Sequence, residues 1–133
     1  MTAGSIAVGR SCGSTTVATT MSQRSLKTID IAQQLGVPAI ELHTGRYAHS
    51  WRRGDAALKE LQRAATHAKS IGLAVHAGHG LTYQNVKPVA AIPEIEELNI
   101  GHSIVSNAVF WGLEEAVRRM VQLVKGSETS QPA

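Results

Sequence analysis

From residue 26 onward, hydrophobic and polar positions follow one repeated order: amphipathic helix, glycine, short apolar strand, polar loop. In residues 26–35 apolar side chains recur at roughly helical spacing, and Gly36 follows as a helix-ending residue. Asp55 precedes a second helix as a potential cap, and Gly72 ends it. The apolar stripe of this second helix consists of Ala57, Leu58, Leu61, Ala64, Ala65 and Ala68.

Three short apolar segments predict strands, at residues 38–43, 73–77 and 97–100. Residues 44–54 predict a polar loop, and residues 113–126 predict a closing helix. The inward positions of that helix are Leu113, Ala116, Val117, Met120, Val121 and Val124. Short helices are also expected after Asn85 and from Ser103. Strands that alternate with helices indicate an α/β fold with a parallel sheet, here with the strands adjacent in chain order and the helices on one side.

The predicted strands also carry polar residues, which is unusual for a parallel sheet. Glu41 and His43 lie on one face of the first strand, His76 lies in the second and Asn99 in the third. Parallel strands covered on both faces are normally continuous apolar runs. Polar side chains near the carboxyl ends therefore favour the interior of a (β/α)8 TIM barrel, whose active site opens at that end.

Residues 1–25 have a different character, because they are rich in Ser, Thr, Gly and Ala and contain no Asp or Glu. They have no sustained period of 2 or 3.6, so we interpret them as a disordered or atypical leader, with an organellar transit peptide as the alternative. Residues 127–133 are expected to form a flexible tail.

Composition narrows the function classes. The chain has 133 residues and a formal net charge of +3 with few aromatic side chains, which argues against nucleic acid and is compatible with small anionic substrates such as phosphates. No apolar run approaches the roughly 18 residues of a membrane span. Cys12 is the single cysteine and cannot form an internal disulfide, which favours a reducing cytoplasm.

The string "AGHGL" at residues 77–81 is the first candidate for chemistry. Gly78 and Gly80 allow positive φ and close approach of the backbone to a ligand. His79 between them is a candidate general acid or base, because its pKa lies near neutrality. The alternative is a glycine-rich turn with a solvent-exposed histidine.

Two further strings extend the candidate site. In "NIGHSIVSNAV", Gly101 and His102 precede a helix start whose backbone N–H groups can bind an anion; the alternative is an ordinary turn. In "IELHTG", Glu41 and His43 form either a proton-steering pair or a satisfied buried pair. The histidines together with Glu41 could suggest a metal, but no compact signature such as HExxH is present, so none is expected.

The strings "IELHTGRYA", "AVHAGHGLTYQNV" and "ELNIGHSIVSNAV" resemble the C-terminal part of the pyridoxine 5′-phosphate synthase family, over roughly residues 28–125. The resemblance implies the last three βα units of a (β/α)8 barrel, at residues 26–126. It implies condensation of 1-deoxy-D-xylulose 5-phosphate with 3-amino-2-oxopropyl phosphate to pyridoxine 5′-phosphate, without a metal or organic cofactor. His79 would be the proton donor, Gly80, Gly101 and His102 would bind substrate, and Glu41 would lie near the reacting centre.

The early strands of that family have no counterpart in the sequence, so we expect a partial barrel. A partial barrel leaves strand edges unpaired, and we therefore expect a homo-oligomer. Two other hypotheses about function stay open. The chain would be a catalytically incomplete fragment that acts only as an associating partial barrel, or a metal hydrolase on a related barrel. Bound zinc and loss of activity to a chelator would identify the hydrolase.

Overall fold

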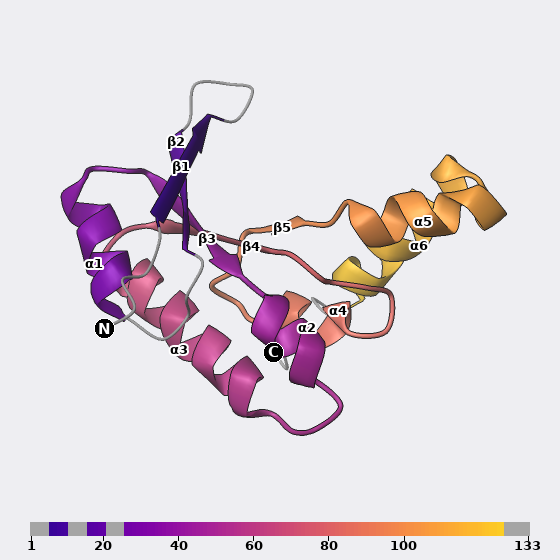
Figure 1. The fold of residues 1–133 in the computed structure, drawn as a ribbon, viewed down its shortest axis with the longest axis horizontal. Helices are drawn as coiled ribbons and strands as arrows, with labels where there is room; N and C mark the ends of the chain where they lie inside the picture. The colour runs from indigo at the N-terminus through magenta and orange to yellow at the C-terminus, as the bar shows by residue number, and fades with distance from the viewer. Residues whose placement is uncertain (1–5, 11–15, 21–25, 127–133) are drawn as a thin grey trace.

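The computed structural model describes residues 6–10, 16–20 and 26–126, and its strands form one sheet in the order β1-β2-β3-β4-β5 (Figure 1). The strands are β1 (Ile6–Arg10), β2 (Thr16–Thr20), β3 (Ala39–His43), β4 (Ala74–Gly78) and β5 (Glu97–Asn99). β1 is antiparallel to β2, whereas β2, β3, β4 and β5 are parallel to one another. The prediction of three parallel strands, adjacent in chain order, is confirmed for β3, β4 and β5.

The sheet extends beyond these three strands on the side of β3. No element was predicted within residues 1–25, yet β1 and β2 lie there. β2 has the sequence TVATT, and its β-branched Thr and Val residues favour strands even without an alternating pattern. Its pairing with β3, from Val17 opposite Ala39 onward, occupies a strand edge that would otherwise be unpaired. The rest of the predicted leader and the predicted tail at 127–133 lie outside the described residues.

Six helices connect or follow the strands in the described part of the chain. They are α1 (Leu26–Gln34), α2 (Gly45–Ser50), α3 (Ala56–Ser70), α4 (Val86–Ala90), α5 (His102–Trp111) and α6 (Leu113–Lys125). The prediction of a loop at residues 44–54 is wrong in part, because Gly45–Ser50 form the helix α2. The helix is stabilised by Tyr47, which is buried and donates a hydrogen bond from its hydroxyl to the Asn85 carbonyl oxygen at 2.7 Å. This long-range contact has no signature in the local pattern.

The hydrophobic core lies on one face of the sheet. Ile40, Leu42, Val75 and Ala77 are fully buried and belong to one cluster with side chains of α1 and α3. The predicted stripe of α3 is buried except for Leu58, which is only partly covered. The opposite face carries the partly exposed side chains of Glu41, His43 and His76, so the alternating residues of β3 and β4 separate an apolar face from a polar one.

The last two helices extend away from the sheet, at the right of Figure 1. In α6 the predicted inward positions Ala116 and Met120 are buried, but Leu113 is 62% exposed and Val117 and Val121 are each 41% exposed. The prediction that the whole stripe faces inward is therefore wrong, because α6 packs mainly on α5 and α4 rather than on the sheet. None of the described helices has both the length and the apolar character that crossing a membrane requires.

Candidate functional site

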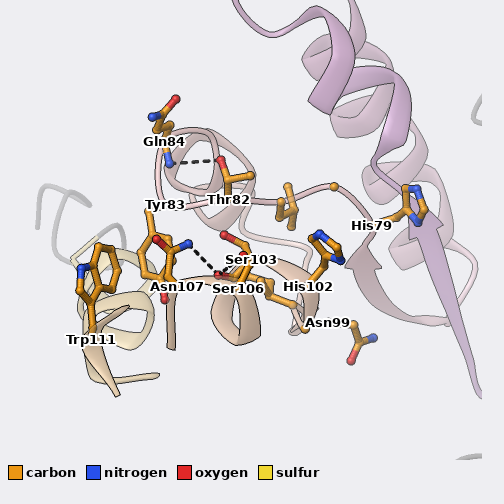
Figure 2. A pocket seen from close by; sticks show the side chains of 14 residues that line it. His79, Thr82, Tyr83, Gln84, Asn99, His102, Ser103, Ser106, Asn107 and Trp111 are labelled. Atoms are coloured by element: carbon orange, nitrogen blue, oxygen red, sulfur yellow. Dashed lines mark hydrogen bonds between the residues drawn. The ribbon is translucent and has the colours of Figure 1, made fainter. Parts of the chain in front are cut away.

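A cleft of about 930 Å³ lies between the loop that follows β4 and the beginning of α5. Figure 2 shows His79 at one end of this cleft and Trp111 at the other. The residues that line it are His79, Gly80, Leu81, Thr82, Tyr83, Gln84, Asn99, Ile100, Gly101, His102, Ser103, Ser106, Asn107 and Trp111. The structure thus brings together four of the five predicted site residues at the carboxyl ends of two neighbouring parallel strands, β4 and β5.

The loop after β4 has an unusual backbone at His79. This residue has φ +86°, and Gly80 has φ +75°. Of the two glycines expected to allow positive φ, Gly80 adopts it and Gly78 does not; the residue before Gly80 with positive φ is His79 itself. Gly78 is needed for close approach instead: a Cβ there would lie 2.9 Å from the Asn99 carbonyl oxygen and 3.0 Å from Glu41 Oε1. A non-glycine residue is uncommon in this region, and such strain is frequent at functional sites.

Two buried polar residues, Thr44 and Asn85, hold this loop in place. Thr44 was not predicted to have a role, and Asn85 was expected only as a possible cap of the helix that follows it; it is the N-cap of α4, without a side-chain cap hydrogen bond. The backbone N–H of Thr44 donates to the Gly78 carbonyl oxygen at 2.7 Å, and its hydroxyl lies 2.8 Å from the Gly78 oxygen and 2.5 Å from the His79 oxygen. Asn85 donates from Nδ2 to the Gly80 carbonyl oxygen at 3.2 Å and accepts from the Thr82 N–H at 2.7 Å. Both residues lie within the strings already singled out, in "IELHTG" and "TYQNV".

The opposite wall of the cleft is the first turn of α5. The helix begins at His102, one residue before the predicted start, and Gly101 is its N-cap without a side-chain cap. Gly101 has φ −113°, and a Cβ built there would meet no atom within 4 Å. Gly101, His102 and Ser103 line the cleft, so the first turn of α5 borders it, which is an arrangement suited to an anion.

Glu41 is the predicted site residue that does not line the cleft. It extends from the polar face of β3, and its Oε2 accepts a hydrogen bond from Asn99 Nδ2 at 2.8 Å. Because Asn99 lines the cleft at the end of β5, the carboxylate is joined to the site by one hydrogen bond. His76, on the same face, has Nδ1 at 3.9 Å from Glu97 Oε1 and lies outside the cleft lining.

His43 stands directly beside His79. The two imidazole rings are stacked, with centroids 4.1 Å apart and an interplanar angle of 28°. Burial lowers the pKa of His43, the neighbouring His79 lowers it further, and the nearby Glu41 carboxylate acts in the opposite direction. His43 therefore favours its neutral form.

The chemistry available here is anion binding together with proton transfer. The start of α5 and the glycine loop offer backbone groups to a phosphate, and His79 offers an imidazole at the end of the same cleft. Among the described residues, no group of three or more His, Cys, Asp or Glu side chains is arranged to hold a metal ion.

Comparison with known proteins shows a family match over most of the chain. Residues 14–126 match the family described as "Pyridoxal phosphate biosynthesis protein PdxJ". Curated relatives named pyridoxine 5′-phosphate synthase include those of Sulfurihydrogenibium sp. (54% identical over 97 residues) and Synechococcus sp. (56% over 98). The one from Coxiella burnetii is 51% identical over 104 residues. These matches cover 72%, 73% and 77% of this chain but only 40%, 39% and 43% of the relatives, so the chain spans about two fifths of their length.

Proposed function

The chain belongs to the family of the pyridoxal phosphate biosynthesis protein PdxJ, and from this premise we propose that its cleft is part of a pyridoxine 5′-phosphate synthase site. The site would bind phosphorylated substrates and transfer a proton. The reaction would be the condensation of 1-deoxy-D-xylulose 5-phosphate with 3-amino-2-oxopropyl phosphate. We further propose a cytoplasmic location.

One observation carries this proposal: His79 and the uncapped start of α5 line the same cleft. A substrate phosphate at the first turn of α5 would be held by backbone N–H groups, with Gly101 leaving room and His102 adding an imidazole. The remainder of the substrate would then extend toward His79 and Gly80. A small phosphorylated substrate fits this combination better than an uncharged one, because the helix start favours an anion.

The proposed roles follow from the positions of the side chains. His79 would donate a proton to a leaving group as it departs, because its ring lies at the end of the cleft on a fixed loop. Glu41 would act on the reacting centre from the polar face of β3, where Asn99 orients its carboxylate at 2.8 Å. Barrels of this class carry their catalytic residues at the ends of several strands, which agrees with contributions from β3, β4 and β5.

The test is an assay of pyridoxine 5′-phosphate formation from the two substrates. The purified chain is assayed alone. It is also assayed as a combined preparation, in which it is co-expressed with the N-terminal part of the Sulfurihydrogenibium relative, which supplies the portion that this chain does not span. We expect product in the combined preparation and a loss of it when His79 is replaced. A combined preparation that forms a stable complex but yields no product would contradict the proposal and favour an associating partial barrel.

A further inference from the structure

We propose that His43 is a positioning residue for His79, whose imidazole it supports face to face so that the ring is held toward the cleft. The inference rests on the proposed function, because it assumes that His79 performs the proton transfer. It concerns a residue that does not line the cleft and would act only through its neighbour.

The pairing of β3 with β4 brings the rings of His43 and His79 together. They come from the ends of neighbouring parallel strands, where His43 is in register with Gly78, the residue before His79. Their centroids are 4.1 Å apart with 28° between the planes, which is a stacked contact rather than an edge contact. With φ at +86°, His79 projects from a strained backbone that alone does not fix the direction of its ring. The ring of His43 supplies a flat surface that fixes the direction of the His79 ring.

The residues around the two rings leave room for both and orient them. The backbone N–H of Gly45 donates to His43 Nδ1 at 3.3 Å, which orients the ring. A Cβ at Gly45 would lie 2.5 Å from His43 Cε1 and 3.2 Å from His79 Cδ2. Glycine at this position therefore leaves room for the stacked pair. Thr44 lies between His43 and Gly45 in the sequence. Its hydroxyl bonds to the carbonyl oxygens of Gly78 and His79 and so fixes the distance between the ends of β3 and β4.

The ionisable groups on the polar face of the sheet are Glu41 and His43 on β3, His76 on β4, Glu97 on β5 and His79 after β4. A positive charge on His43 would repel a proton-carrying ring at a centroid distance of 4.1 Å. Burial lowers the pKa of His43 and so favours its neutral ring, whose Nδ1 accepts a hydrogen bond from the N–H of Gly45. A neutral His43 can therefore support the ring of His79 without opposing the proposed role of His79 as the proton donor.

The experiment measures both geometry and catalysis in the combined preparation described above. In His43→Ala we expect kcat to fall by at least about tenfold with KM nearly unchanged, since misplacing a catalytic group costs up to roughly 100-fold. The ring-proton NMR resonances of His79 should move downfield, because the ring current of the stacked neighbour is lost. His43→Phe keeps an aromatic face and should retain most of kcat and the upfield resonances. His67→Asn, on the remote helix α3, is the matched histidine control and should change neither.

The outcomes separate this inference from the proposed function. Unchanged His79 resonances in His43→Ala would overturn the stack, and shifted resonances with an unchanged kcat would overturn the positioning role while leaving the proposed function intact. If His43→Ala fails to fold, His43→Gln replaces it, with the same expected loss of kcat and of the ring current. A wild-type kcat in His79→Gln would overturn the proposed function, and the positioning role with it.

Discussion

Among single residues, His79 combines a side chain suited to proton transfer with a backbone conformation that non-glycine residues rarely adopt. It is the one non-glycine residue with positive φ among those described, and it is followed by Gly80 with φ +75°. A left-handed conformation costs a residue with a Cβ roughly 1 kcal/mol or more. The hydrogen bonds of Thr44 and Asn85 hold the loop in this form. We interpret this unfavourable conformation as the consequence of placing an imidazole at the end of the cleft.

Replacement of His79 by Gly and by Ala separates the backbone from the side chain. Both variants should lower kcat of the combined preparation by about 10²–10⁴-fold with little change in KM, which is the usual contribution of a positioned acid or base. His79→Gly should unfold at a higher temperature than His79→Ala, because alanine keeps the unfavourable φ. Steady-state kinetics and thermal unfolding measure these effects. A raised KM with an unchanged kcat would instead make His79 a phosphate-binding residue.

Among the helices and strands, the sequence pattern predicted those that follow from periodic apolar positions. It missed those that depend on contacts between residues far apart in the sequence. The strands β3, β4 and β5 and the helices α1 and α3 follow from repeated apolar positions, and Gly36 and Gly72 adopt positive φ at the ends of those helices. The helix α2 was missed because the burial of Tyr47 depends on Asn85, far away in sequence. The strands β1 and β2 lack alternation, and the stacking of His43 on His79 depends on the pairing of β3 with β4.

Glycine is required at two positions of the site for different structural reasons. Substitution by alanine at one and by valine at the other distinguishes these reasons. Gly80 has φ +75° and a Cβ there would lie 2.7 Å from Ala48 Cβ, so Gly80→Ala should lower thermal stability. Gly101 has negative φ and open space around it, so Gly101→Val should lower stability less while reducing phosphate affinity by crowding the ligand. Thermal unfolding and ³¹P NMR titration with inorganic phosphate measure both effects. Equal phosphate affinity in folded Gly101→Val would remove the start of α5 from the site.

At the scale of the whole molecule, the described chain buries one face of its sheet and leaves large apolar side chains on α5 and α6 exposed. Val109 is 80% exposed and Phe110 is 84% exposed, and both lie on α5, which extends away from the sheet (Figure 1). β1 and β2 cover one edge of the parallel strands, whereas no strand among the described residues pairs with the far edge of β5. Exposed apolar patches and open edges are typical of surfaces that associate.

We therefore expect the chain to form homo-oligomers at micromolar concentration. Replacement of Val109 and Phe110 by Glu should shift the population toward the monomer, because it places charges within the exposed apolar surface. Sedimentation velocity of the wild type and the double variant measures this effect, and Lys27→Glu on α1 is the control for the change in charge. A compact, stable wild-type monomer would count against the expectation.

In the proposed function, the cleft between the β4–α4 loop and α5 binds the phosphorylated substrate. The most direct test is a titration of the isotope-labelled chain with 1-deoxy-D-xylulose 5-phosphate, followed through the backbone amide resonances. Binding at the proposed site predicts saturable shifts at Gly80, Gly101, His102 and Ser103, with residues of the remote helix α3 unchanged. Saturable shifts confined to other parts of the molecule, or none at millimolar ligand in the folded chain, would contradict the claim.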